Sequence, residues 1–270
     1  MTGALSGPGI SPGGRSRAAW FTAFWLVVGV GSYVLGVRNA LGQRAENSVL
    51  DAAEFTTNPP PPLNLVSIPT VAIALVVIGL LALWAHGLRR AFVVTIVPAL
   101  AILASQLLKL QLLTRPQLFE LDAPNTFPSG HMTVFTALVG ALIWAVPARI
   151  RAIVALLGAV LLGAVGWQLL AYGWHRPSDV FGGIALVCCV FALAGLVRPA
   201  HTRGRIALAR TVSVGLALVG WILAGGALVL AGIAGLQASS ELMLSAGEFG
   251  GLAAGALAAR SLLRLSAGQD

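Results

Sequence analysis

The sequence predicts an all-α protein, a polytopic transmembrane bundle of about eight spans, with six to eight as the range. Hydrophobic residues make up 57% of the chain, charged residues only 10%, and the mean hydropathy is +0.89. Ordinary globular chains carry about a quarter charged residues. Several apolar runs also approach the roughly 20 residues that a helix needs to cross a bilayer. These runs are separated by short basic or acidic stretches.

Eight apolar runs are candidate membrane spans. They cover residues 18–37, 68–84, 91–113, 131–146, 150–172, 180–197, 211–233 and 242–259. The last run is the least apolar, because it contains Glu248 and many glycines. Small residues are common where transmembrane helices pack closely, so the composition of the final two runs favours tight helix contacts.

The chain ends are expected to lie outside this membrane domain. Residues 1–17 are rich in Gly, Ser and Pro, which predicts a disordered cytoplasmic tail. The membrane domain is expected to cover residues 18–264, followed by a short cytoplasmic tail at 265–270. The first run is longer than the apolar part of a signal peptide and lacks a convincing cleavage site, so we expect it to remain as a span.

The charged residues predict the orientation of the spans, since cytoplasmic loops collect Lys and Arg. Alternate connections hold the basic residues Arg15, Arg17, Arg89, Arg90, Arg149, Arg151, Arg198, Arg203, Arg205, Arg210, Arg260 and Arg264. The connections of the other side hold most carboxylates, namely Glu46, Asp51, Glu54, Glu120, Asp122, Asp179 and Glu241. We therefore expect a multi-pass protein of the cell membrane with both termini in the cytoplasm.

Composition also argues against some classes of partner. The formal net charge is +8, but the basic residues are scattered through short loops, so no nucleic-acid partner is expected. Cys188 and Cys189 are neighbours in an apolar run and suit neither a disulfide framework nor a metal site. The first external loop, about 41–66, contains a proline run at 59–62 that favours an extended spacer. That loop is either a linker or a lid.

Three polar segments carry the candidate chemistry, and each lies at the outer end of a predicted span. The first is K-L-Q-L-L-T-R-P, from Lys109 to Pro116. The second is N-T-F-P-S-G-H at 125–131, and the third is W-H-R-P-S-D at 174–179. Because the three segments share one membrane face, we expect their polar side chains to come together there.

The first two segments are suited to binding an anion. The Arg115 guanidinium can hold phosphate oxygens bidentately, whereas Lys109 is either a ligand or a cation that extends to the headgroups. Ser129 and Gly130 form a tight turn at a helix N-terminus, where free backbone N–H groups bind anions readily. Ser129 can add a hydroxyl donor and Gly130 permits close approach. A plain N-cap is the alternative interpretation of Ser129.

The third segment pairs an imidazole with a carboxylate. His175 and Asp179 are four residues apart, with Pro177 suited to the first helical turn. Asp179 can accept a hydrogen bond from one imidazole nitrogen, which fixes the tautomer and leaves the other nitrogen free to attack phosphorus. A helix-start aspartate beside an interfacial histidine is the alternative. His131, at the end of the second segment, strengthens the functional interpretation.

Together, these segments resemble the type 2 phosphatidic acid phosphatase family, which is related to glucose-6-phosphatase and vanadium haloperoxidases. The resemblance covers about residues 109–183, and its most specific part is F-P-S-G-H followed about 44 residues later by H-R-P-S-D-V-F-G-G. It implies a phosphatase core at about 68–200. It also implies that His175 is the nucleophile, Asp179 orients it and His131 protonates the leaving alkoxide. Arg115, Ser129 and Gly130 would bind the phosphoryl oxygens.

The chain departs from the family pattern at two places. The family's first motif has its Lys seven positions before the Arg, but Lys109 and Arg115 are six apart, a change of about 100° around a helix. The third motif has Ser-Arg where this chain has Gln168 and Leu169. We hypothesise that Arg176, beside the nucleophile, supplies the missing charge, because phosphoryl transfer needs its equatorial oxygens neutralised.

The resemblance implies a lipid phosphatase. No cluster of carboxylates suits Mg²⁺, and two histidines with one aspartate are too few for a structural zinc, so we expect no metal and no cofactor. The expected partners are membrane lipids and a lipid phosphate or polyprenyl (di)phosphate at the extracytoplasmic face. The aliphatic spans suit acyl and polyprenyl tails alike, and the sequence sets no oligomeric state. Alternatives are a zinc site made by His131, His175 and Asp179, a phosphotransferase using the same site, and a catalytically weak protein that binds or transports lipid headgroups. The spans exclude a soluble haloperoxidase-like role.

Overall fold

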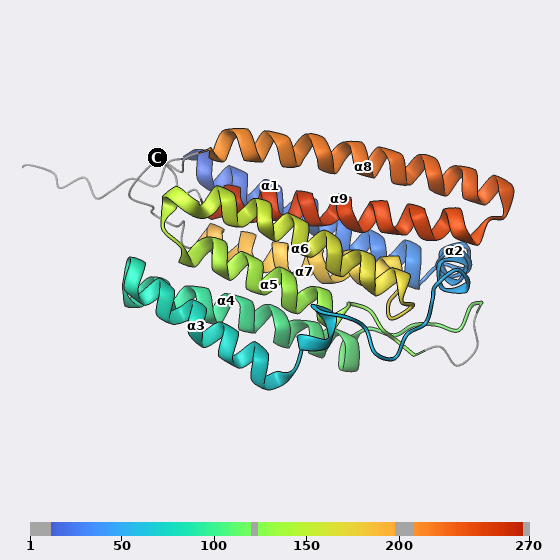
Figure 1. The fold of residues 1–270 in the computed structure, drawn as a ribbon, viewed down its shortest axis with the longest axis horizontal. Helices are drawn as coiled ribbons and strands as arrows, with labels where there is room; N and C mark the ends of the chain where they lie inside the picture. Colours follow the sequence, from blue (N-terminus) through green and yellow to red (C-terminus); the bar gives the residue numbers. More distant parts are fainter. Residues whose placement is uncertain (1–11, 120–123, 198–207, 267–270) are drawn as a thin grey trace, which may run out of the picture.

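The computed structural model describes residues 12–119, 124–197 and 208–266, and these ranges contain helices and no strand (Figure 1). The helices are α1 (Pro12–Ser32), α2 (Ala40–Asp51), α3 (Ile68–His86), α4 (Leu88–Leu107), α5 (Gly130–Ala145), α6 (Arg151–Ala171), α7 (Pro177–Val197), α8 (Ala209–Gln237) and α9 (Ser240–Ser266). Single π-helical turns extend α1 (Tyr33–Val37) and α4 (Leu108–Leu112). Short 3₁₀ turns occupy Leu63–Leu65 and Ala148–Ile150.

Each of the eight predicted spans is a helix, so the prediction of a polytopic helical bundle is confirmed. Seven helices in the described ranges are long and apolar enough to cross a membrane. The eighth, α5, has only 16 residues. It lies in the middle of the bundle, where 12 of these 16 residues are buried. The final two spans, α8 and α9, are long helices that pack against each other.

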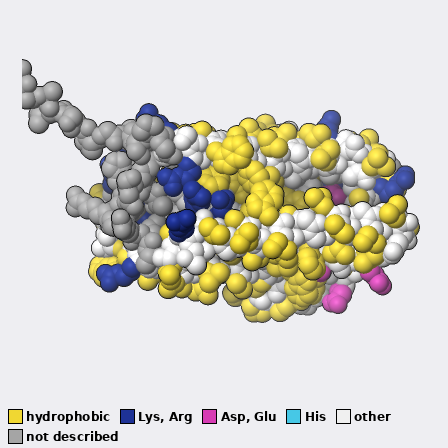
Figure 2. Space-filling view, turned by 90° about the horizontal axis from the view of Figure 1, so that it is seen from above, with side chains coloured by type: hydrophobic (Ala, Val, Ile, Leu, Met, Phe, Trp, Pro, Cys, Tyr) yellow, Lys and Arg dark blue, Asp and Glu magenta, His cyan; other side chains and the backbone are white. Residues whose placement is uncertain are grey.

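The bundle has a protein-packed centre and an apolar outside. In α6 and α7, 56% of the most apolar stretch is buried, compared with 11% in α3 and 17% in α8. In Figure 1, α6 and α7 lie between α8 and α3. Large hydrophobic side chains such as Trp84, Trp221 and Leu236 remain exposed on the outer helices. Figure 2 shows hydrophobic side chains spread over much of one face of the bundle. An exposed apolar belt of this kind costs free energy in water but not in lipid, where the solvent is itself apolar.

Basic side chains gather at the end of the bundle that holds the α3–α4 and α5–α6 connections (Figure 2). There they bind helix C-termini: Arg90 Nε donates to Trp144 O at 2.9 Å, and Arg151 Nη1 donates to Ser266 O at 3.1 Å. Cations are favoured at such ends because unpaired carbonyls gather there. The residues Glu120, Asp122, Arg198, Arg203 and Arg205 lie outside the described ranges. The assignment of this end to the cytoplasm stays a prediction.

Helices occupy parts of two segments for which the sequence predicted none. The first external loop begins with α2, which is capped by Asn39: its Oδ1 accepts from the N–H of Leu41 at 2.9 Å and from that of Gly42 at 3.3 Å. A side chain that accepts these otherwise unpaired N–H groups favours a helix start. Helix α1 begins at Pro12, so residues 12–17 are helical. The tail residues 1–11 and 267–270 lie outside the described ranges.

The rest of the first external loop is bound to the outer end of α6. Glu54 N donates to Ala171 O at 2.8 Å, and Gln168 Nε2 donates to Pro61 O at 3.1 Å. Trp174 Nε1 donates to Thr56 O at 2.7 Å. Residues 52–66, called the anchored loop below, are therefore attached to the turn that carries His175.

Close packing of α5 against α7 depends on a glycine. A Cβ added to Gly183 would lie 2.8 Å from Ser129 O and 3.2 Å from Thr133 N, which are backbone atoms that cannot swing away. Any larger residue at this position would therefore push the start of α5 away from α7. That start carries His131.

We expect Gly183→Ala to lower the melting temperature of the purified protein in detergent, because overpacking costs about 1–3 kcal/mol. Gly225→Ala is the matched control, since no atom lies within 4 Å of its added Cβ. The control should be neutral or slightly stabilising, because Ala is a better helix former than Gly. Equal melting temperatures for the two variants would contradict the close α5–α7 contact.

Candidate active site

The three polar segments meet at one end of the bundle, as their positions in the sequence predicted. The first follows α4, the second precedes α5, and the third joins α6 to α7. The rings of His131 and His175 lie side by side, with their centroids 6.2 Å apart. A phosphoryl group has the dimensions to bridge two imidazoles at this separation, so the arrangement is compatible with one shared site.

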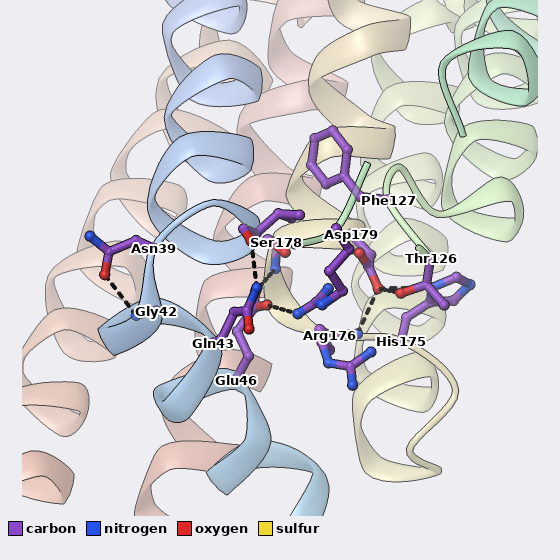
Figure 3. A network of polar contacts seen from close by, with 12 residues as sticks. Asn39, Gly42, Gln43, Glu46, Thr126, Phe127, His175, Arg176, Ser178 and Asp179 are labelled. Atoms are coloured by element: carbon purple, nitrogen blue, oxygen red, sulfur yellow. Dashed lines mark hydrogen bonds and ion pairs between the residues drawn. The ribbon is translucent and has the colours of Figure 1, made fainter. Parts of the chain in front are cut away.

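Asp179 is the centre of the hydrogen-bond network (Figure 3). Its Oδ2 accepts from Thr126 Oγ1 at 2.6 Å and from the backbone N–H of Arg176 at 3.1 Å. The same oxygen lies 3.3 Å from His175 Nδ1. Asp179 is in the first turn of α7 and is completely buried. These contacts place the carboxylate both at the helix start and beside the histidine. Orientation of His175 by Asp179 stays a prediction.

Backbone and amide contacts fix the second segment against the other two. Ser129 N donates to Asp179 O at 2.9 Å, which attaches the entry of α5 to the start of α7. Asn125 Nδ2 donates to Lys109 O at 3.1 Å and to Leu113 O at 2.9 Å, so it caps the carbonyls at the end of α4. These bonds bring the ends of α4, α5 and α7 to one place.

Ser129 and Gly130 form the predicted helix start. Ser129 Oγ accepts from Met132 N at 3.2 Å, and the residue is fully buried. The structure therefore gives Ser129 the role of N-cap. Gly130 is the first residue of α5. Contact of Ser129 and Gly130 with phosphoryl oxygens stays a prediction.

His131 lies against Trp174 as well as His175. The His131 and Trp174 rings are 5.4 Å apart at an interplanar angle of 66°, an edge-to-face contact. The Trp174 indole donates to Thr56 O in the anchored loop. The anchored loop, Trp174 and His131 thus form a continuous set of contacts, so the orientation of the His131 imidazole depends on a segment far away in the sequence.

Lys109 lies near the site despite its altered spacing from Arg115. It lies in the π-helical turn Leu108–Leu112, where the rotation per residue differs from that of an α-helix. Its ammonium is close enough to interact electrostatically with both Asp179 and His131. The one-residue change in spacing rotates Lys109 by about 100° only in a regular α-helix. Because Lys109 lies in a π-helical turn, that figure does not apply here. The role of Lys109 as a ligand stays a prediction.

Arg115 is paired with a carboxylate that no motif in the sequence connects to it. Arg115 Nη2 lies 3.0 Å from Glu46 Oε2, and both side chains are almost fully buried. The other Glu46 oxygen accepts from Ser178 N at 2.8 Å, at the start of α7 (Figure 3). Burial, together with the smaller effect of the Asp179 carboxylate, raises the pKa of Glu46 above its usual range.

Gln168 and Leu169, which stand where the family motif has Ser-Arg, are neutral residues that make structural contacts. Gln168 uses its amide to bind the anchored loop, and the Leu169 side chain is fully buried. The backbone carbonyl of Leu169 accepts from Trp174 N at 3.0 Å and from His175 N at 3.1 Å. Arg176 is next to the nucleophile candidate and is 6% exposed. It is the basic residue of the third segment, and compensation by its charge stays a hypothesis.

Three residues of the site were not predicted from the sequence: Thr126, Trp174 and Glu46. Thr126 and Trp174 stand inside the quoted motifs. Thr126 is a possible donor to the Asp179 carboxylate, and Trp174 is an aromatic residue next to His175, so each could have been considered from the sequence. Glu46 is different, because it lies 69 residues before Arg115. Asn39, followed by apolar and polar residues at helical spacing, indicates the helix α2. Nothing in this local pattern indicates that Glu46 contacts Arg115.

Comparison with known proteins agrees with the motifs. The PAP2 superfamily model matches residues 105–203, just over a third of the 270 residues. The searches of curated proteins and of solved structures found no match. The matched segment contains Arg115, both histidines and Asp179. Residues 105–203 therefore match the PAP2 superfamily, in agreement with the resemblance of the motifs to the type 2 phosphatidic acid phosphatase family.

Proposed function

We propose that this protein is an integral membrane phosphatase that hydrolyses a lipid phosphate or diphosphate through a phosphohistidine intermediate, without a metal. The observation that carries the proposal is the buried His175–Asp179 pair at 3.3 Å with the His131 ring beside it. A nucleophile, a group that orients it and a second proton carrier are the parts that covalent phosphoryl transfer requires. The PAP2 superfamily match supports the same class of enzyme.

In the first step, His175 attacks phosphorus. Its Nδ1–H donates to Asp179 Oδ2, which leaves the lone pair of Nε2 available. The new Nε2–P bond forms as the bond from phosphorus to the lipid oxygen breaks. His131 gives its proton to that oxygen, so the lipid leaves as a neutral alcohol, or as a lipid monophosphate when the substrate is a diphosphate.

In the second step, water replaces the histidine. His131, now neutral, takes a proton from the water as its oxygen attacks phosphorus, and the Nε2–P bond breaks. Inorganic phosphate leaves, and His131 is protonated again for the next cycle. Dividing one difficult displacement into two easier ones is the general advantage of a covalent intermediate.

The cations of the site are suited to stabilise the phosphoryl oxygens. Lys109 interacts electrostatically with His131 and Asp179. Arg115 lies three residues after the π-helical turn that extends α4, and Arg176 adjoins His175. The N–H groups at the α5 start add neutral donors. Phosphoryl transfer depends mainly on such positioning and charge stabilisation, because the transition state is loose and its oxygens carry the charge.

The substrate is proposed to be a lipid, because the site lies at the end of an apolar bundle. Helices α3 and α4 expose large aliphatic side chains such as Ile73, Leu80 and Leu103 near the site-bearing core. An acyl or polyprenyl tail can lie along such a surface while its phosphate reaches the histidines. Charge segregation between the two ends supports an extracytoplasmic site and cytoplasmic termini.

A phosphate-release screen tests the proposal directly. Purified protein in detergent should release phosphate from phosphatidic acid, phosphatidylglycerol phosphate or a polyprenyl diphosphate. His175→Ala should abolish release, and His131→Gln should reduce it by about 10²–10⁴, the usual contribution of general acid–base catalysis. His86→Gln is the matched control and should retain activity, because His86 lies at the α3–α4 connection, at the end of the bundle opposite the histidine pair. Substrate binding without any release would favour the headgroup-binding alternative, and transfer to an added alcohol would favour the phosphotransferase.

The contribution of Arg176 is tested separately. If it supplies the missing charge, Arg176→Ala should lower kcat/KM by about 10²–10³, the cost of removing one donor to the transition state. Arg176→Lys keeps the charge and should retain more activity. Since the side chain is buried, melting temperatures of both variants must be compared with wild type. A fully active and stable Arg176→Ala protein would overturn the compensation hypothesis.

Metal independence is tested with a chelator. Excess EDTA should leave phosphate release unchanged, because neither proposed step uses a metal ion. The zinc alternative predicts loss of activity on chelation and recovery on adding Zn²⁺. Metal analysis of the purified protein before and after treatment provides the control.

A further inference from the structure

The helix α2 brings a buried carboxylate to the site from outside the family segment. It covers Ala40–Asp51, whereas the PAP2 superfamily match begins at residue 105. Three residues at a spacing of three, Gln43, Glu46 and Val49, form its buried face. Gln43 Nε2 donates to Val37 O and to Pro116 O, each at 2.7 Å. This face therefore packs against the first polar segment just after Arg115.

Glu46 connects two parts of the site. Its Oε2 binds Arg115 Nη2 at 3.0 Å, and its Oε1 accepts from Ser178 N at 2.8 Å. Ser178 precedes Asp179, so one carboxylate holds both the guanidinium and the first turn of the helix that orients His175. A Cβ on Gly36 would come within 2.8 Å of Glu46 Oε1, so the glycine leaves room for this contact.

The Arg115 guanidinium keeps one donor group unused. Its side chain is 3% exposed, and Nη1 is buried with no hydrogen-bond partner among the described residues. A buried donor on a charged group is costly unless it finds an acceptor. An anionic oxygen of the substrate is the partner that fits, because a guanidinium can hold two acceptors on different nitrogens.

Stability alone does not explain such a pair. A buried ion pair gains little net free energy, because desolvation of both charges offsets most of their attraction. Its value lies in geometry, since the carboxylate fixes one Nη and thereby sets the direction of the other. The structure is therefore better explained by orientation of Arg115 than by a contribution to folding.

We propose that Glu46 is a positioning residue that orients Arg115, together with the first turn of α7, for binding of a substrate phosphoryl group. The inference deepens the proposed function and rests on it for the identity of the ligand. Glu46 touches no reacting atom, and it acts through Arg115. A segment that lies outside the family match would thus complete the phosphate site of this chain.

The test compares Glu46→Gln with Asp51→Asn, which removes an exposed carboxylate from the same helix. In Glu46→Gln the amide oxygen can still accept from Ser178 N, but the amide nitrogen then faces Arg115 with N–H groups. We expect KM for phosphatidic acid to rise by about tenfold or more, the cost of one charge-assisted hydrogen bond, with a smaller change in kcat. Asp51→Asn should match wild type. An unchanged or lower KM in Glu46→Gln would overturn the proposal.

A double-mutant cycle separates positioning from structural support. In an Arg115→Gln background, Glu46→Gln should have little further effect on KM, because its route of action is already removed. If Glu46 only supported the fold, the second substitution would reduce activity and melting temperature equally in both backgrounds. That result would contradict the proposal.

Binding to the inactive protein distinguishes failure of this inference from failure of the proposed function. In His175→Ala protein, adding Glu46→Gln should weaken binding of short-chain phosphatidic acid by about tenfold. If wild type releases no phosphate but this loss of affinity is found, positioning stands and the phosphatase proposal fails. If wild type is active but affinity is unchanged, the positioning proposal fails.

The pH profile gives an independent readout. Burial raises the pKa of Glu46, and the charged groups that act on it are Asp179 and Arg115. Because its pKa is raised, Glu46 becomes protonated at a higher pH than an exposed glutamate does. Protonation removes the negative charge that holds Arg115. KM of the wild type should therefore rise toward acid, and Glu46→Gln should lack this component while it retains any due to Asp179. Parallel KM profiles for the two proteins would contradict the proposal.

Discussion

The site depends on one buried carboxylate oxygen. Oδ2 of Asp179 receives Thr126 Oγ1, the N–H of Arg176 and the Nδ1 side of His175 within 3.3 Å. Thr126 comes from the segment that leads into α5, and His175 and Arg176 come from the α6–α7 turn. A carboxylate with no exposed surface must be satisfied by such donors. These contacts hold the second and third polar segments together and place the imidazole of His175 beside the carboxylate.

The membrane environment explains why the polar residues gather at the ends of the bundle. Within the hydrocarbon layer each helix satisfies its own backbone, and side chains need only pack. Gly183 illustrates the packing, because its missing side chain lets α7 approach the backbone at Ser129. The close approach also affects the candidate site, because the start of α5 that packs against Gly183 carries His131, whose ring lies beside that of His175. Packing in the apolar interior thus controls geometry at the polar end.

This chain uses its own residues where the family pattern is absent. The position of the family's arginine is held by Leu169, whose carbonyl supports the turn before His175. Gln168 binds the anchored loop, and that loop also receives the indole of Trp174 beside His131. Glu46, from α2, forms an ion pair with Arg115. The N-terminal third of the chain therefore contributes to a site whose recognisable motifs all come later.

The sequence by itself determined the helical class, the positions of eight apolar helices and the three polar segments, because hydropathy and motif spacing are local properties. It also placed Asp179 in the first turn of the helix that follows His175, since Pro177 is suited to a helix start. Only the tertiary structure decided that Glu46 meets Arg115, that Trp174 lies against His131, and that the π turn at Lys109 keeps its ammonium near the site. These contacts join residues far apart in the chain, and no local pattern records which distant surfaces pack together.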